Sequence, residues 1–142
     1  MAAKQLSVFI ENRKGRLGEV LRVLKENNIN ILSQSLADTT EYGLFRLIVD
    51  KPELCKEKLS ENGFSTILTN VLIVKMSHTS GSLQELMQLL AENNISVEYM
   101  YGLSIDGSDA SVVLKTSELE AAEALLAKNG TSFLTSEDVA QM

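Results

Sequence analysis

Apolar residues occupy every second position in residues 5–11, at Leu6, Val8 and Ile10. This is the period of a β-strand, whose successive side chains point to opposite faces. After a loop at 12–15, apolar residues recur at helical spacing up to Asn27-Asn28, which ends the predicted helix because asparagine tolerates the left-handed conformation. The residues that set this spacing are Leu17, Val20, Leu21 and Leu24.

The next stretch predicts a hairpin, a second helix and a closing strand. A turn at 38–43 separates the two strands of the hairpin. Pro52 is favourable in a first helical turn and starts the helix, which carries Leu54 and Leu59 and ends at Asn62-Gly63. The three strands predicted here cover residues 29–37, 44–49 and 64–69.

The sequence repeats itself at a distance of 66 residues. Between residues 11–31 and their counterparts there are eight identities, too many for two unrelated amphipathic helices, so the chain contains a duplication. The identical pairs are Gly15/Gly81, Leu17/Leu83, Glu19/Glu85, Leu24/Leu90, Glu26/Glu92, Asn27/Asn93, Asn28/Asn94 and Ile29/Ile95.

The second copy predicts the same order of elements. Its first helix ends at Asn93-Asn94 and its second at Asn129-Gly130. The run Asp106-Gly107-Ser108-Asp109 is a hairpin signal; as a cation loop it lacks the spaced ligands that follow in an EF-hand. Strands are predicted over 71–76, 95–105, 110–115 and 131–135. A helix that carries Leu83, Leu86, Met87 and Leu90 follows the loop at 77–81, and a second helix lies near 117–127.

Each copy therefore has the order βαββαβ. The expected fold is α+β: two tandem ferredoxin-like modules, residues 1–69 and 70–142, each with an antiparallel sheet and both helices on one face. Because almost no linker separates Thr69 from Val71, we expect the two modules to pack side by side.

Composition narrows the class of protein. The net charge of −6 argues against nucleic acid as a partner, because phosphate contacts need clustered Lys and Arg. Cys55 is the only cysteine, so no intramolecular disulfide can form, as suits a reducing cytosol. The start of the chain predicts no signal peptide, and no apolar run approaches the roughly 18–20 residues that span a bilayer. We therefore expect a soluble cytoplasmic protein without a membrane partner.

The strand–loop–helix segment resembles the ACT-domain family. The resemblance rests on Glu11-Asn12-Arg13-Lys14-Gly15-Arg16-Leu17 and on Asn27-Asn28-Ile29-Asn30-Ile31, and it extends over both halves, residues 5–136. It implies a stand-alone pair of ACT-like modules. Members of this family bind amino acids or other small effectors between modules and regulate metabolic enzymes, as a fused domain or a separate subunit.

A physical argument supports a ligand site at the same segment. A helix N-terminus has unpaired N–H groups and partial positive charge, which suit a ligand carboxylate. Glycine removes side-chain bulk there, and an asparagine carbonyl at position 12 suits a ligand ammonium. With the family resemblance, this predicts ligand-binding residues Asn12, Arg13, Lys14, Gly15, Arg16, Leu17 and Ile31, with Ser33 or the neighbouring module, and His78, Thr79, Ser80, Gly81, Ser82 and Leu83.

The two loops differ from each other and from the family pattern. His78 stands at the Asn12 position, and Lys14 replaces the proline that commonly precedes the glycine. For each glycine the plain alternative is a backbone requirement of a tight turn. His78, the single histidine, is expected to be a solvated or capping residue, and Cys55 a small hydrophobe rather than a catalytic nucleophile.

Several strands look apolar on both faces, which predicts an oligomer. The residues that face away from the helices in this prediction are Phe9, Leu44, Ile48, Val71, Ile73 and Val113, joined by Tyr99 and Tyr101.

The sequence supports two functions of different classes. The leading hypothesis is a homodimeric regulatory protein that binds an amino acid and modulates a separate metabolic enzyme, with no cofactor and no metal. The alternative is an interaction subunit of an enzyme complex that binds nothing small. No arrangement of nucleophile and base, or of paired carboxylates, can be placed on one site, so an enzyme is not expected.

Overall fold

The computed structural model describes residues 2–11, 14–38, 42–76, 81–104 and 110–142. The chain divides into two compact units. The first-copy unit consists of Lys4–Thr69 with Val139–Met142, and the second-copy unit of Asn70–Asp138 with Met1–Ala3. Each unit therefore takes a short segment from the far end of the chain.

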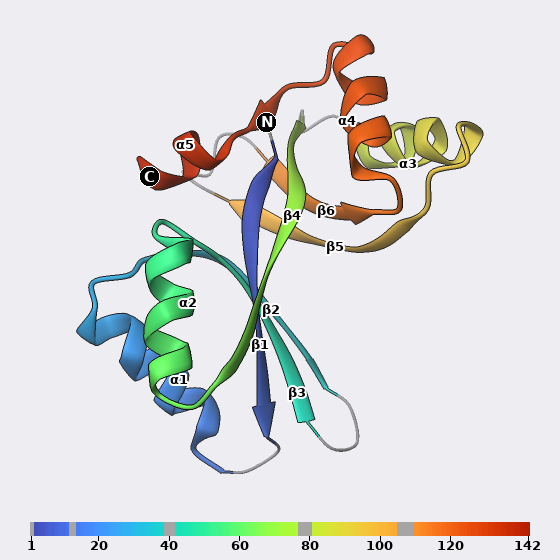
Figure 1. Cartoon of the computed structure of the whole chain (residues 1–142). Helices are drawn as coiled ribbons and strands as arrows, with labels where there is room; N and C mark the ends of the chain where they lie inside the picture. The colour runs from blue at the N-terminus through green and yellow to red at the C-terminus, as the bar shows by residue number, and fades with distance from the viewer. Residues whose placement is uncertain (1, 12–13, 39–41, 77–80, 105–109) are drawn as a thin grey trace. The chain divides into compact units, whose positions relative to one another are not determined.

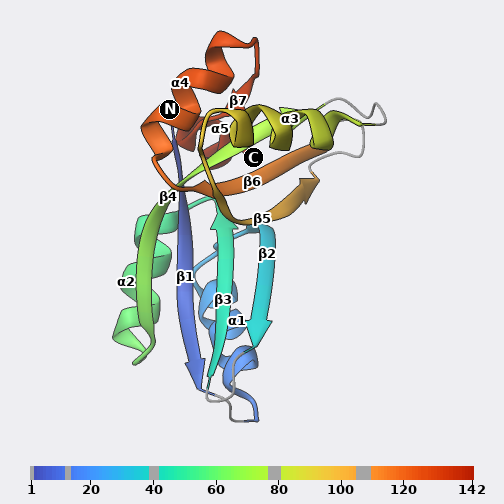
Figure 2. The ribbon, with the colours of Figure 1, turned by 90° about the vertical axis from the view of Figure 1, so that its right-hand side faces the viewer.

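The first-copy unit is a four-stranded sheet with both helices on one face. Its sheet has the order β2-β3-β1-β4, and Figures 1 and 2 show α1 and α2 on the same side of it. β3 pairs antiparallel with both neighbours, Leu47 lying opposite Leu6 and Gln34. The elements are β1 (Ala3–Glu11), α1 (Arg16–Glu26), β2 (Ile31–Asp38), β3 (Tyr42–Val49), α2 (Pro52–Glu61) and β4 (Ser65–Met76).

The second-copy unit repeats this plan with a shorter last strand. Its strand order is β7-β4-β6-β5, and the described pairings are antiparallel. Ser136 Oγ donates a hydrogen bond to the Ala2 carbonyl at 3.1 Å, which ties the first residues of the chain to this unit. The elements after β4 are α3 (Ser82–Glu92), β5 (Val97–Ser104), β6 (Ala110–Thr116), α4 (Leu119–Lys128), β7 (Phe133–Leu134) and α5 (Ser136–Ala140).

Each unit has its own core between the sheet and the helices. In the first core, the alternating apolar residues of β1 and the buried residues of α1 pack against α2. In the second core, the equivalent residues of β4 and α3 pack against α4. The first core includes Leu6, Val8, Val20, Leu24, Phe45, Leu47, Cys55 and Leu59. The second includes Leu72, Val74, Leu86, Leu90, Leu114, Ala122 and Leu126.

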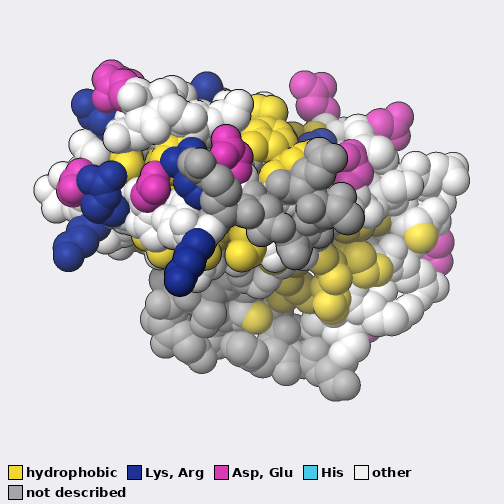
Figure 3. Space-filling view, turned by 90° about the horizontal axis from the view of Figure 1, so that it is seen from below, with side chains coloured by type: hydrophobic (Ala, Val, Ile, Leu, Met, Phe, Trp, Pro, Cys, Tyr) yellow, Lys and Arg dark blue, Asp and Glu magenta, His cyan; other side chains and the backbone are white. Residues whose placement is uncertain are grey.

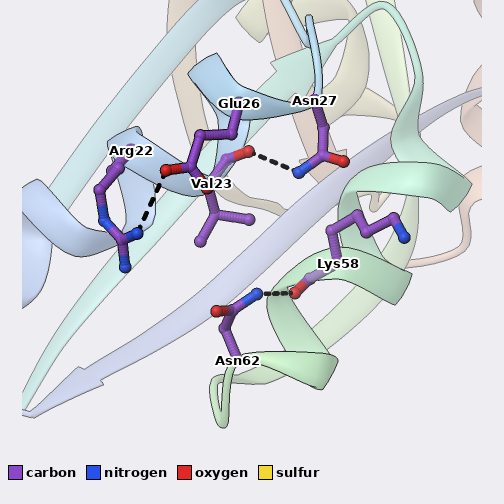
Figure 4. A network of polar contacts seen from close by, with 6 residues as sticks. All are labelled: Arg22, Val23, Glu26, Asn27, Lys58 and Asn62. Carbon is purple, nitrogen blue, oxygen red and sulfur yellow. Dashed lines mark hydrogen bonds and ion pairs between the residues drawn. The ribbon is translucent and has the colours of Figure 1, made fainter.

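The four long helices end as the asparagines predicted. Asn28 and Asn94 have φ of 56° and 59°, and Gly63 and Gly130 have φ of 84° and 81°. The first asparagine of each ending also caps the helix with its side chain, since its Nδ2 donates to the carbonyl four residues earlier. Figure 4 shows two of these bonds, and the four are Asn27 to Val23 (2.8 Å), Asn62 to Lys58 (2.7 Å), Asn93 to Leu89 (2.9 Å) and Asn129 to Leu125 (2.9 Å).

The structure corrects several expected boundaries. The predicted strands at 64–69 and 71–76 form one 12-residue strand, β4, because exposed Asn70 continues the extended backbone. β7 has only two residues where 131–135 were expected, and α5 was not predicted. The expected hairpin turn at 106–109 lies outside the described residues, as does much of the turn at 38–43.

The apolar residues that set the helical spacing are not equally buried. Leu21 and Leu83 are 37% and 39% exposed, while Val23 is buried at 2%. The buried residues of α1 are therefore Val20, Val23 and Leu24, and those of α3 are Leu86 and Leu90.

Several strands do carry apolar residues on both faces, as predicted. Most of the second-face residues were expected to be exposed, however, and are buried. Ile48, Val71, Ile73 and Val113 are fully buried within the single chain, and Phe9 and Leu44 are half-buried. Phe9 also makes an edge contact with Tyr42, with ring centroids 5.8 Å apart. These side chains therefore do not form a free apolar face.

Candidate functional site: the loop–helix junctions

Each copy begins its first helix from a glycine in the left-handed conformation. Gly15 has φ 89° and ψ −9°, and Gly81 has φ 91° and ψ −6°. Their carbonyls accept the first helical hydrogen bonds, from the N–H groups of Glu19 (3.1 Å) and Glu85 (3.0 Å). No side chain of the described residues caps either helix at its glycine. The first turns therefore carry the partial positive charge that a ligand carboxylate would meet.

The glycines are explained by their backbone conformation. At φ near 90° any L side chain is strained, whereas no atom of the described residues, adjacent ones aside, lies within 4 Å of where a Cβ would stand at either position. A tight turn therefore requires glycine here whether or not a ligand binds. The open space beside it also means that close approach to the backbone is possible.

The structure describes only part of the predicted site. Asn12, Arg13, His78, Thr79 and Ser80 lie outside the described residues. Among the others, Lys14, Gly15, Gly81 and Leu83 are exposed, and Leu17 and Ser82 are half-buried. Ile31 is half-buried against the first core, and Ser33, two residues further along β2, is buried.

Arg16 is held by its own unit. Its Nη1 lies 2.7 Å from Glu19 Oε2, its guanidinium carbon lies 4.2 Å from the centre of the Phe64 ring, and its side chain is only 16% exposed. The Arg16 Nε is buried without a hydrogen-bond partner among the described residues. This arginine therefore fills space beside the junction instead of projecting towards a ligand, which the sequence prediction did not foresee.

The second-copy unit contains two hollows that sequence reasoning missed. One, of about 540 Å³, is lined by Met87, Ala91 and residues 94–97. Val97 is the counterpart of Ile31 in the first copy. The other, of about 510 Å³, is lined in part by Ser82 and Glu85. For the second hollow, the available signal was the change from Arg16 to Ser82 within an otherwise matched repeat.

Cys55 shows no sign of reactivity. It is fully buried in the first core. Burial, with the Asp50 carboxylate as the second cause, raises the pKa of the thiol from 9.0 to about 12, so the thiolate is scarce near neutral pH. Cys55 is therefore a small core residue. His78, the single histidine, lies outside the described residues.

The described residues offer little to other ligand classes. Within them, no group of three His, Cys, Asp or Glu side chains is placed to hold a metal ion. None of their helices combines the length and apolar character needed to cross a bilayer. On the face seen in Figure 3, Lys and Arg side chains are interspersed with acidic ones, and hydrophobic side chains reach the surface between them.

Taken together, the duplicated βαββαβ order and the paired glycine-initiated junctions define a tandem α+β protein of the ferredoxin-like class. The model of the ACT domain pair family matches residues 1–142, and the chain belongs to this family. No curated protein matches the chain in sequence.

Solved structures agree with this assignment. The chain is 31% identical to protein BT0572 from Bacteroides thetaiotaomicron, with a TM-score of 0.93 over 100% of this chain and 98% of that one. The ligand-free regulatory subunit of aspartate kinase from Thermus thermophilus is 18% identical, with a TM-score of 0.62 over 88% and 91% of the two chains. The corresponding subunit from Thermus flavus is 17% identical, with a TM-score of 0.59 over 88% and 90%. The last two likenesses concern the fold.

Proposed function

We propose that this chain is a regulatory protein that binds a free amino acid and thereby modulates a separate enzyme of amino-acid metabolism. The observation that carries the proposal is the pair of helix N-termini that begin at left-handed Gly15 and Gly81, which no side chain of the described residues caps, in a chain of the ACT domain pair family. The fold it shares with an aspartate kinase regulatory subunit supports the same role. No residue is assigned a catalytic step.

The ligand site is proposed at the junctions. The carboxylate of the amino acid would accept hydrogen bonds from the first-turn N–H groups of α1, at Gly15 to Leu17, and Asn12 would bond the ammonium group. Ile31 at the start of β2 would border the ligand. The equivalent second-copy site would use residues 78–83, with His78 in place of Asn12.

A homodimer is part of the proposal. β2 and β5 end the strand orders of their units, so each offers an open edge. Both carry a large exposed apolar residue, Leu36 at 56% and Met100 at 42% exposure. Pairing of these edges between two copies would cover these side chains and place junctions beside a second molecule.

The same exposed residues favour the alternative function, an interaction subunit that binds nothing small. A thermal-shift screen of the twenty amino acids separates the two, because a ligand specific to the folded state raises the apparent melting temperature. We expect one amino acid, or a few related ones, to raise it. If none does while the chain still self-associates, the interaction subunit is the better description.

The placement of the site is tested by Asn12→Ala with the amino acid that the screen identifies. Losing a hydrogen bond to a charged ligand group costs about 1.5–3 kcal/mol, so calorimetry should show affinity reduced roughly tenfold to a hundredfold. Asn70→Ala, at an exposed asparagine of β4, is the matched control and should bind normally. Unchanged affinity in a folded Asn12→Ala variant would remove Asn12 from the site.

A further inference from the structure

The two copies differ in how they use one position beside the first helix. In the first copy, the guanidinium group of Arg16 occupies it, held between the carboxylate of Glu19 and the face of the Phe64 ring. A cation above an aromatic face and beside a carboxylate is favourable on both sides. The first copy thus shows what kind of group this position accepts.

The second copy keeps the carboxylate but has neither the guanidinium group nor the aromatic ring. Glu85 stands at the Glu19 position, but Ser82 replaces Arg16. The residue equivalent to Phe64 is Thr131, since the N–H groups of both close their helices in the same way, Phe64 onto the Leu59 carbonyl and Thr131 onto the Leu126 carbonyl, each at 3.0 Å. An arginine and a phenylalanine side chain are therefore replaced by two small ones.

A cavity of about 510 Å³ lies where these side chains are missing. α3 contributes Ser82, Glu85, Leu86 and Leu89, β4 contributes residues 74–76, and the α4–β7 connection contributes residues 129–132. All of these residues belong to the second-copy unit, so the cavity is complete within one repeat. It shares Ser82 with the junction site but extends away from it, towards the connection after α4.

The charge of the cavity is set by Glu85. No ion pair of Glu85 is found among the described residues, in contrast to Glu19. Lys75 borders the cavity, but it alternates with Val74 and Met76, which contact the helix-side core, so its side chain points to the other face of the sheet. The cavity therefore combines a carboxylate with the apolar side chains of Leu86 and Leu89.

We propose that this cavity is a second ligand site, for a small free organic cation that carries a guanidinium or primary ammonium group on an aliphatic stem. Glu85 is the counter-ion of the charged group, in the role that Glu19 has for Arg16, and Leu86 and Leu89 contact the stem. This site goes beyond the proposed junction site, since it lies within one repeat and recognises a cation instead of a carboxylate.

The direct test titrates the full chain with n-butylguanidinium, and with n-butylurea as the uncharged analogue. Binding is monitored by the amide NMR signals of the chain. Saturable shifts are expected at Ser82, Glu85 and Thr131 for the cation, with an affinity in the millimolar range because Glu85 is exposed. Equal binding of the urea, shifts centred on α1, or no saturable shift would overturn the proposal.

Variants connect the binding to the named residues. Glu85→Gln should weaken binding by about two- to fivefold, the range for an exposed ion pair, while Glu19→Gln, the matched change in the first copy, should leave it unchanged. The double variant Ser82→Arg with Thr131→Phe rebuilds the first-copy arrangement and should abolish binding by filling the cavity. Full affinity in Glu85→Gln contradicts the proposal even if the double variant fails to fold.

A peptide probe distinguishes a free cation from the side chain of a protein. A Gly-Arg-Gly peptide that binds much more tightly than n-butylguanidinium would point to a protein side chain as the source of the cation and overturn the free ligand. The junction site is judged separately, by the response of the amino-acid ligand to Asn12→Ala. Failure at Glu85 therefore leaves the proposed function standing, and failure at Asn12 leaves the cavity standing.

Discussion

Thr135 and Asp138 cap the start of α5 reciprocally. The Thr135 N–H donates to Asp138 Oδ2 at 2.8 Å, and the Asp138 N–H donates to Thr135 Oγ1 at 3.2 Å. The Thr135 hydroxyl also donates to Oδ2, at 3.0 Å. These bonds form a capping box. They favour the carboxylate, so the pKa of Asp138 is lowered, chiefly by the Thr135 N–H and then by its hydroxyl.

The capping box predicts an acid-sensitive C-terminal helix. Because the pKa of Asp138 is lower in the folded state, its contribution is present above the unfolded pKa of about 3.9 and is lost as pH falls through the folded value. Amide protection of residues 136–140 should therefore decline in acid. Asp138→Asn should remove this pH dependence, whereas Glu137→Gln, the adjacent charge change, should retain it. An identical acid profile in Asp138→Asn would contradict the assignment.

The junction glycines predict opposite effects of alanine within one segment. Gly15→Ala and Gly81→Ala should each lower the free energy of unfolding by about 1–2 kcal/mol, because their φ near 90° strains an L residue. Gly18→Ala is the control: Gly18 lies inside α1 without a positive φ and with open space around its Cβ, so alanine should stabilise by about 0.5–1 kcal/mol. Chemical denaturation measures all three, and a neutral Gly15→Ala would exclude the strain argument.

Burial of Cys55 predicts slow thiol chemistry and a loss of stability in alkali. A pKa of about 12 in the folded state against 9.0 means that stability is fully present below 9.0 and declines as pH rises towards about 12. A thiol reagent should label the folded chain far more slowly than the chain unfolded in denaturant. Cys55→Ala should abolish the alkaline decline that this group causes. Rapid labelling of the folded chain at neutral pH would show that the thiol is accessible.

The proposed dimer predicts which surface charges weaken self-association. Leu36→Lys on β2 and Met100→Lys on β5 should shift light scattering towards the monomer mass, because lysine disfavours pairing of an open edge. Ile67→Lys is the control, since Ile67 is 50% exposed on β4, away from the β2 and β5 edges of the proposed pairing. A wild-type chain that is monomeric at micromolar concentration would end the dimer proposal.

The fold was predictable because its signals are local and occur twice. The Asn27-Asn28 and Asn93-Asn94 endings act through backbone conformation within one helical turn, and both were confirmed. The start of α5 had a readable signal as well, since Thr135 and Asp138 have the spacing of a capping box. Strand β4 was divided because Asn70 was interpreted as the boundary between the two modules, whereas it lies within one continuous strand.

The cavity beside Ser82 was not predictable from the same sequence. Its origin is a contact between Arg16 and Phe64, which lie far apart in the chain, and no periodicity reports that they meet. The absence of that contact in the second copy becomes meaningful only when the first copy supplies the reference. The junction residues, by contrast, were proposed from sequence pattern, and both their binding role and the ligand stay predictions.

Each unit includes a terminal segment from the other repeat, so the two repeats cannot be separated by a single cut without dividing both units. Val139, 4% exposed, is grouped with the first-copy unit, and Ala3, 1% exposed, with the second-copy unit. A gene severed between codons 69 and 70 would therefore give two fragments that each lack a buried residue supplied by the other. Separating the two repeats at this point would therefore expose apolar positions that the intact chain buries, in both fragments at once.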